Sequence, residues 1–362
     1  QDEKLRAKFT GTPEKVINLM TYMAEEVREI LARLGYRSLN EIIGRTELLR
    51  QVSRGAEHLD DLDLNPILAK VDARDDQRSF NIDTPRNEVP DSLDAEMIDD
   101  ARPVFERREK MQLTYTVRNT HRAVGTRFSA KITAKYGMSS LNEDHVHIRL
   151  RGSAGQSLGA FLCQGITLEV FGDSNDYVGK GLCGGKIVVR PMVSSPLVSQ
   201  DNTIIGNTVL YGATAGQLYA AGQAGERFAV RNSGADVVVE GCGANGCEYM
   251  TGGNAVILGP VGSNFGAGMT GGMAFILDIE DNFEKMANKE SIIWQRLDSA
   301  YWESHLLSLI ERHHKSTDSK WSESILRDWD RWRDRFWQVC PKEMISRIAH
   351  PLSDKEAIVA AE

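Results

Sequence analysis

The chain has 362 residues, with 43 basic and 51 acidic side chains and a formal net charge of −8. Apolar residues make up 41 % of it and charged residues 26 %, values that are typical of a globular protein. The acidic balance argues against a nucleic-acid binder, which would carry a clustered basic face, and no apolar run reaches the roughly 18 residues of a membrane span.

The first 56 residues predict helices that belong to a larger body. Thr12 and Pro13 are typical of a helix start, Gly35 of a helix end, and Ser38 with Glu41 of a capping box that opens a second, short helix. The apolar stripe of the first helix has few partners nearby. Because the chain opens on Gln1 with a charged segment, we expect it to be a piece of a longer protein.

Residues 57–114 are predicted to form an acidic, extended connector. Between residues 57 and 100 there are 14 acidic and 4 basic side chains, a local balance of −10. Pro66, Pro85 and Pro90 interrupt the segment, and its hydrophobic periodicity is weak. Charge runs of this kind are usually solvated, so a cation-binding tail is the less favoured interpretation.

Glycine dominates residues 115–280. Of the 32 glycines, 28 lie between Gly125 and Gly272, and several precede short β-branched runs. The glycines that introduce these runs step by 20, 21, 19, 9, 19 and 19 residues: they are Gly165, Gly185, Gly206, Gly225, Gly234, Gly253 and Gly272. This spacing is too long for hairpins and leaves no room for crossover helices. We therefore expect a mainly β fold, a right-handed parallel β-helix of about 20 residues per coil, flanked by N-terminal and C-terminal helices.

All six tryptophans lie between Trp294 and Trp337, in a charged segment with helical periodicity. A solenoid needs its open end covered, so residues 281–350 are predicted to form a Trp-rich helical cap, or to dock on a neighbouring domain. Residues 351–362 are predicted to be a disordered tail.

The pattern Gly-x-Gly-x-x-Gly occurs three times, beginning at Gly179, Gly241 and Gly266. A single copy between a strand and a helix would favour a dinucleotide site. Here two copies lead directly into strands, so no helix N-terminus is available for a pyrophosphate, and the repetition favours structural turns.

Cysteine, histidine and basic residues suggest no site by their spacing. Five cysteines without regular spacing indicate a reducing compartment, so we expect a cytoplasmic protein with small buried thiols in place of a metal site. His313 and His314 point in two directions from one helix. A basic patch is open to two interpretations, an anion site near Arg122 and Arg127 or pairing with the acidic connector; it consists of Arg122, Arg127, Lys131 and Lys135. No catalytic, cofactor-binding or metal-ligating residue is therefore assigned.

Six ordered segments resemble the C-terminal domain of the glutamate synthase large subunit. They are NTHRAVGTR at 119–127, GSAGQS at 152–157, NDYVGKGL at 175–182, GNTVLYGAT at 206–214, GERFAVRNSG at 225–234 and CEYMTGG at 247–253. The helices of 1–56, through EIIGR at 41–45, resemble the tail of that enzyme's FMN-binding barrel. The resemblance is continuous over 115–278 and covers most of the chain.

The resemblance implies an enzyme that forms L-glutamate from glutamine and 2-oxoglutarate, with a glutaminase domain, an FMN barrel and a 3Fe-4S cluster. It also implies a small FAD/NADPH subunit or ferredoxin as electron donor. The nucleophilic N-terminal cysteine and the three cluster cysteines of the family have no counterpart here. We therefore expect a scaffold that contacts the glutaminase and FMN-barrel domains and is itself inactive and free of cofactor.

Two other functions remain open at this stage. One is an independent β-helix that binds a protein partner, or a subunit of another multi-domain oxidoreductase. The other is a free-standing enzyme, which would need an acid/base pair with perturbed pKa values in a cleft.

Overall fold

The computed structural model describes residues 8–53, 55–70 and 90–354. The chain divides into two compact units, Gln1–Val89 and Pro90–Glu362, and each is described by itself.

The first unit contains one long helix and several short ones. Helix α2 (Pro13–Leu34) begins as predicted, because the Thr12 side chain accepts a hydrogen bond from Lys15 N, and it ends at Gly35 in the left-handed conformation (φ 78°). The predicted second helix is a single 3₁₀ turn, η1 (Leu39–Glu41), where Ser38 Oγ donates to Glu41 Oε1 at 3.3 Å. The remaining elements are η2 (Thr46–Leu48), α3 (Glu57–Asp60) and α4 (Asn65–Leu68).

Helix α2 exposes its apolar side chains. Leu31 is its one buried residue, whereas Met20 is 58 % exposed and Tyr22 is 70 % exposed. Seven further apolar residues of α2 are exposed: Val16, Ile17, Leu19, Met23, Val27, Ile30 and Leu34. The stripe that the sequence predicted therefore finds no cover among the described residues.

Residues expected to be an extended connector contain helices. Within the described part of 57–114 lie α3, α4, α5 (Leu93–Asp100), α6 (Arg102–Arg107) and the start of β1 (Met111–Val117). The stretch 71–89 lies outside the described residues.

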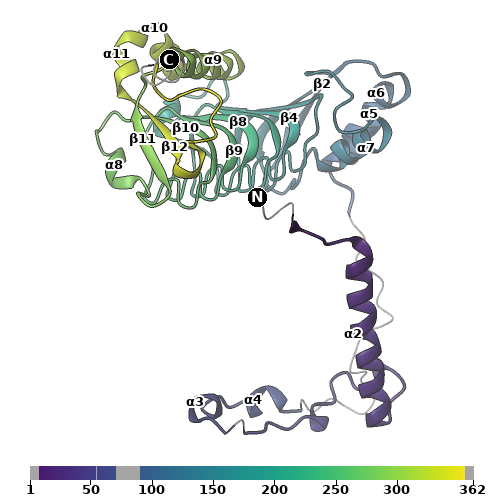
Figure 1. Cartoon of the computed structure of the whole chain (residues 1–362). Helices are drawn as coiled ribbons and strands as arrows, with labels where there is room; N and C mark the ends of the chain where they lie inside the picture. Colours follow the sequence, from purple (N-terminus) through teal and green to yellow (C-terminus); the bar gives the residue numbers. More distant parts are fainter. Residues whose placement is uncertain (1–7, 54, 71–89, 355–362) are drawn as a thin grey trace. The chain divides into compact units, whose positions relative to one another are not determined.

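The second unit is built on one 12-stranded sheet, mostly parallel (Figure 1). Its main strand order is β1-β2-β3-β4-β6-β8-β9-β10-β12-β11, with β5 paired to β3 and β7 paired to β5. The strands are β1, β2 (Val146–Ala154), β3 (Ile166–Ser174), β4 (Cys183–Arg190), β5 (Thr203–Ile205), β6 (Ala215–Ala220), β7 (Gln223–Ala224), β8 (Ser233–Val239), β9 (Thr251–Ile257), β10 (Gly271–Leu277), β11 (Ile292–Arg296) and β12 (Phe336–Pro341). Only β12 runs antiparallel to both its neighbours, β10 and β11.

The predicted fold class is wrong. The structure is an α/β fold, in which helices account for 32 % and strands for 25 %, and the strands form a mostly parallel sheet; it is not a mainly β right-handed β-helix. The glycine period does correspond to the strand register, which advances by 20 residues from Ile148 to Leu168 and by 19 from Leu168 to Ile187. The period therefore reported the spacing of parallel strands, and it did not establish how the whole chain folds.

Two of the glycine-led runs are turns. Residues 207–211 and 226–230 lie in loops, where Thr208, Leu210, Arg227 and Ala229 all have positive φ. The register between Ile187 and Leu218 steps by 31 residues because β5 and the loop before it are inserted there. The apparent shift of nine residues between Gly225 and Gly234 arises because one glycine precedes a loop and the other lies within β8.

The loops share a backbone pattern that explains two of the three Gly-x-Gly-x-x-Gly motifs; the glycines of the motif that begins at Gly241 do not have positive φ. In each loop, three alternate residues have φ between 54° and 74°, and the loops are joined by backbone hydrogen bonds such as Phe161 N to Lys180 O at 2.8 Å. The positions are 157, 159, 161; 177, 179, 181; 208, 210, 212; 227, 229, 231; 245, 247, 249; and 264, 266, 268. Gly179, Gly181, Gly266 and Gly268 belong to this set, because glycine adopts positive φ without strain.

Apolar side chains cover one face of the sheet throughout and the other face from β4 to β10, whereas the outer faces of β1 and β2 carry exposed polar residues. One face forms a continuous core that includes Ile148, Leu168, Ile187, Leu218 and Val237. Alternate residues on the other face pack against helix α9 (Ala300–Thr317), which contributes Leu306, Leu309 and Ile310 to a second cluster. Figure 1 shows α9, α10 (Lys320–Arg327) and α11 (Trp329–Trp332) gathered on one side of the sheet. Helix α7 (Thr126–Tyr136) packs against α5 near β2.

The segment 281–350, expected to be a helical cap, combines helices and strands. Besides α9, α10 and α11 it holds α8 (Phe283–Met286), β11, β12, η4 (Arg333–Arg335) and η5 (Lys342–Met344). A further 3₁₀ turn, η3 (Ser199–Asp201), lies outside this segment and precedes β5. In the predicted disordered tail, Leu352 is buried and its carbonyl accepts a hydrogen bond from Gln295 Nε2; residues 355–362 lie outside the described residues.

Candidate functional site

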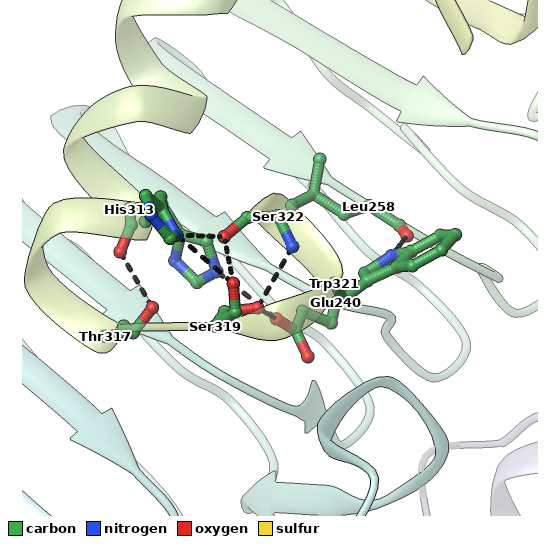
Figure 2. Close-up of polar contacts among 8 residues, drawn as sticks. Glu240, Leu258, His313, Thr317, Ser319, Trp321 and Ser322 are labelled. Atoms are coloured by element: carbon green, nitrogen blue, oxygen red, sulfur yellow. Dashed lines mark hydrogen bonds and ion pairs between the residues drawn. The ribbon is translucent and has the colours of Figure 1, made fainter. Parts of the chain in front are cut away.

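A buried polar cluster lies where the junction between α9 and α10 meets the sheet (Figure 2). Glu240 follows β8 directly, and His313 lies in the last turns of α9. Asp318 ends α9 in the left-handed conformation (φ 55°), and Ser319 begins α10 as its N-cap, accepting from Ser322 N at 3.1 Å. This tight reversal between two helices places the Ser319 side chain beside Glu240.

Glu240 has two oxygens in different situations. Its Oε1 accepts a hydrogen bond from Ser319 Oγ and lies 3.4 Å from His313 Nε2. Its Oε2 has no partner within the part of the chain that the structure describes, although the side chain is 0 % exposed. Figure 2 shows one oxygen turned toward the hydroxyls and imidazoles and the other turned away from them.

The surrounding side chains hold the helix junction together. Thr317 Oγ1 donates to the His313 carbonyl at 2.7 Å, and Ser322 Oγ donates to the Ser319 carbonyl at 3.0 Å. Trp321 Nε1 donates to the Leu258 carbonyl at 2.6 Å, which ties α10 to the end of β9. These bonds satisfy buried polar groups and stabilise α10 against the sheet.

The cluster lacks the geometry of a Ser-His-acid triad. Ser319 donates directly to Glu240, so no imidazole stands between hydroxyl and carboxylate. His314 Nδ1 lies 3.2 Å from the Ser319 carbonyl, so it carries a proton and cannot accept one from Ser322, although Ser322 Oγ is 3.4 Å away. Nucleophilic chemistry is therefore not what this arrangement supports.

A cavity of about 220 Å³ adjoins the cluster and shares Glu240, Leu258 and Trp321 with it. Four acidic side chains belong to its lining, Asp201, Glu240, Asp278 and Glu280, and no basic residue is among the described lining residues. The cluster and cavity together are the candidate site.

The parts of this site are far apart in the chain, so their spacing in the sequence does not reveal it. Glu240 and Ser319 are separated by 79 residues, and Glu240 and His313 by 73. His313 and His314 do point in two directions: His313 is fully buried toward Glu240, and His314 faces the start of α10. The one sequence signal was Glu240 itself, an acidic residue directly after the apolar run of β8.

The basic patch is divided among separate partners. Arg127 lies 3.9 Å from Asp91, an acidic residue of the predicted connector, and Lys131 Nζ lies 4.7 Å from the ring centroid of Phe105. Lys135 lies over the ring of Tyr136, and Arg122 is exposed. The structure does not gather these four side chains around one point.

The cysteines do not suit an iron–sulfur cluster. All five are free, and among the described residues no three His, Cys, Asp or Glu side chains converge as metal ligands. Cys163 and Cys183 are neighbours through a backbone bridge, while burial raises the pKa of Cys242 to about 12. A cluster needs thiolates, so these residues do not fit one. His147 Nε2 lies 3.0 Å from Glu169 Oε2.

The chain matches one family model and several curated proteins. A family model described as the GXGXG motif matches residues 94–342, and the chain belongs to this family. The chain is 65 % identical over 360 residues to the glutamate synthase [NADPH] large chain of Azospirillum brasilense, covering 99 % of this chain and 24 % of that protein.

Other relatives carry related names. The chain is 43 % identical over 374 residues to the glutamate synthase [NADPH] large chain of Bacillus subtilis (strain 168), covering 100 % of this chain and 24 % of that protein. It is 44 % identical to ferredoxin-dependent glutamate synthase 2 of Synechocystis sp. (strain ATCC 27184 / PCC 6803 / Kazusa), covering 94 % of this chain and 22 % of that protein. The chain thus spans about a quarter of the length of these curated relatives. Among the described residues, no helix has both the length and the apolar character to cross a bilayer.

Proposed function

We propose that this chain is the C-terminal portion of a glutamate synthase large chain and that it holds the catalytic domains of that chain in register. The complete protein would form L-glutamate from glutamine and 2-oxoglutarate in the cytoplasm, using FMN, a 3Fe-4S cluster and electrons from a small subunit or ferredoxin. The match to glutamate synthases over 94–100 % of this chain, two of them large chains, carries the proposal.

The chain's own residues support a scaffold without chemistry. Two of its three Gly-x-Gly-x-x-Gly motifs are accounted for by left-handed loops, its buried Glu240 is bonded directly to a serine, and its cysteines are free thiols in or beside the core. The sheet is rigid from β4 to β10, where it is buried on both faces, because each strand there is fixed by two neighbours and by packing above and below.

The exposed apolar side chains of helix α2 support the inference that it contacts residues outside this chain. Nine large apolar side chains between Val16 and Leu34 are exposed, and such an apolar stripe normally faces a core. We expect α2 to pack against the FMN barrel of the longer chain.

The proposal is tested first on the 362-residue chain. It is expected to fold, to show no visible absorption from flavin or an iron–sulfur cluster, and to lack glutaminase activity. A flavin or cluster spectrum from the purified chain would overturn the scaffold role.

A matched pair of variants tests α2 in the longer chain. In the longer chain, Met20→Glu is expected to lower the flavin content and the activity. In the 362-residue chain it is expected to leave the free energy of unfolding unchanged, because Met20 is 58 % exposed. Glu26→Gln, also on the exposed surface of α2, is the control and should change neither. Full activity of the Met20→Glu longer chain would contradict the proposed contact.

A further inference from the structure

Strand β1 forms one edge of the sheet and pairs with a single strand, β2. The pairing is parallel and runs without a register shift over all seven residues of β1. In a parallel pair, alternate residues turn their backbone N–H and C=O groups toward the neighbouring strand. Met111 N donates to the His145 carbonyl at 3.1 Å, so the odd-numbered residues of β1 face β2. The backbone groups of Gln112, Thr114 and Thr116 therefore point away from the sheet.

These outward backbone groups have no hydrogen-bond partner within the part of the chain that the structure describes. An open edge attracts further strands, and natural proteins usually protect it with a charge, a proline, a bulge or a short strand. Residues 111–117 contain neither a charge nor a proline, and their pairing with β2 has no bulge. At the opposite edge of the sheet, β11 has five residues and ends on Arg296. The edge at β1 is therefore the one that is suited to receive another strand.

The hydrophobic core is also incompletely covered at this edge. Leu113 and Tyr115 pack against the core but are only partly buried, whereas Ile148 and Leu150, which pair with them on β2, are fully buried. A strand added beside β1 would extend the core by one layer of side chains. Such a strand needs apolar side chains at alternate positions, next to Leu113 and Tyr115.

Basic side chains surround the open edge. Lys110 and Arg118 flank β1, and Arg151 lies on the exposed face of β2. All three are exposed, and none has an ion-pair partner among the described residues. Asp100 does contact β1, but it already accepts a hydrogen bond from Tyr115 Oη at 2.8 Å. The charges at the edge therefore favour a partner strand that has carboxylates near its ends.

A second copy of β1 does not meet this requirement. Antiparallel pairing of two copies over all seven residues would place Lys110 of one copy opposite Arg118 of the other. Like charges directly opposite each other destabilise a strand pair. The partner strand therefore has a different sequence from β1.

We propose that β1 pairs with an extended segment of the longer chain that lies outside these 362 residues. The segment has alternate apolar residues and an acidic residue near at least one end. This inference rests on the proposed function, and the chain spans only 24 % of its Azospirillum brasilense relative, so most of such a protein lies outside it. Backbone hydrogen bonds to Gln112, Thr114 and Thr116 provide the affinity, and the basic flanks fix the register.

The test compares hydrogen exchange in the 362-residue chain and in the longer chain without any partner subunit, by mass spectrometry that resolves individual amides. In the 362-residue chain, the Thr114 and Thr116 amides should exchange faster than those of Leu113 and Tyr115, which face β2. In the longer chain, the Thr114 and Thr116 amides should exchange about tenfold more slowly or less. Amides of β8, inside the sheet, are the control and should exchange equally in both chains.

Two results would overturn the proposal. One is equal exchange of Thr114 and Thr116 in the two chains. The other is protection that rises with the concentration of the 362-residue chain, which would identify a second copy as the partner. Neither result decides the proposed function, which fails on a flavin or cluster spectrum from the 362-residue chain.

Thr114→Pro tests the added hydrogen bonds directly, because proline lacks the N–H and the N–H of Thr114 does not bond to β2. The 362-residue variant should therefore fold, whereas in the longer chain Gln112 and Thr116 should lose their protection. Thr114→Ser keeps the N–H, so this matched control should retain the protection. If Thr114→Pro does not fold, Arg118→Glu in the longer chain should lower the protection of Thr116 by repelling the acidic partner. Unchanged protection in either folded variant contradicts the proposal.

Discussion

The aromatic ring of Phe161 lies directly over Gly181 of the next loop. A Cβ atom at residue 181 would stand 2.5 Å from Phe161 Cε1, closer than real Cβ atoms approach other atoms. Both residues have left-handed backbone, with φ of 55° and 62°. The same relationship recurs between Tyr249 and Gly268, again at 2.5 Å. A side chain at the position under the ring would therefore have to displace that ring, which is 55 % exposed in Phe161 and 49 % exposed in Tyr249.

Gly181→Ala is expected to destabilise the chain through both strain and collision. A non-glycine residue at this φ costs about 1 kcal/mol, and displacing the half-exposed Phe161 ring adds about 0.5 kcal/mol. Gly212→Ala is the matched control, because Gly212 occupies the equivalent loop position at φ 67° with nothing within 4 Å of its Cβ site. Urea unfolding should show a larger loss of unfolding free energy for Gly181→Ala. Equal losses would mean that the ring contact contributes nothing.

This loop arrangement shows what sequence patterns can and cannot predict. The repeated glycines correctly indicated structural turns and the spacing of strands, because both depend on local backbone conformation. The pattern failed at 207–211 and 226–230, where β-branched and aromatic residues favour strands but the stacked loops impose positive φ. The fold class failed for a related reason: packing of α9 on the sheet and the antiparallel β12 are tertiary features that a local period does not encode.

Asp94 provides a second test, at the start of α7. Its Oδ1 accepts from Gly125 N at 2.8 Å and its Oδ2 from Phe128 N at 3.0 Å, and the residue is 1 % exposed. Asp94→Ala leaves two buried donors unpaired, so we expect a loss of about 2–4 kcal/mol of unfolding free energy. The check is urea unfolding followed by circular dichroism.

The matched control for Asp94 is Asp91→Ala in the same acidic stretch. The Asp91 side chain is 91 % exposed and its ion pair with Arg127 is long, at 3.9 Å. Substitution of an exposed surface residue such as Asp91 normally changes the free energy of unfolding by no more than about 0.5 kcal/mol. A similar loss for both variants would show that the stretch stabilises the fold by general charge and not through the Asp94 cap.

The environment of Glu169 predicts that the free energy of unfolding depends on pH in the acid range. Burial opposes its ionisation, but His147 and Arg149, at 3.0 and 3.2 Å, outweigh burial and lower the pKa of Glu169 below its ordinary value of 4.5. A carboxyl with a lowered pKa in the folded state stabilises the protein above its unfolded pKa, and this contribution is lost as the pH falls through the folded pKa.

Glu169→Gln should therefore destabilise the chain by about 1 kcal/mol near neutral pH and have little effect once the pH is below the folded pKa. The measurement is the urea midpoint across the acid range. The control is Glu106→Gln, because the Glu106 side chain is 62 % exposed beside Arg107. This variant should leave the change of the urea midpoint with pH in the acid range unchanged. A pH-independent loss for Glu169→Gln would show that its charge is not what stabilises the sheet.

The candidate site illustrates a different limit of sequence analysis. Thr12 and Gly35 were assigned correctly as helix caps, because a cap is recognised from a few adjacent residues. Glu240, His313 and Ser319 come together only when α9 folds back over β8, and nothing in the spacing of these residues records that contact. Buried polar clusters of this kind are visible only once tertiary structure is known.

The thiols give the last prediction. Burial raises the pKa of Cys242 to about 12 and that of Cys340 to about 11, and it raises the pKa of Cys247 well above 9.0. Cys183 is the one cysteine that is partly exposed, and burial raises its pKa too. Because the thiolate is the reactive form, the folded chain should react slowly with a disulfide reagent at mildly alkaline pH, and at Cys183 alone.

In urea, all five cysteines of the chain should react. Cys183→Ser is the matched variant: it should abolish labelling of the folded chain and reduce the count in urea by one. Rapid labelling of Cys242 or Cys247 in the folded chain would mean that their loops open readily, since both side chains are buried in the core between stacked loops. The rigidity that the scaffold role requires would then be lacking at the loops that carry the glycine motifs.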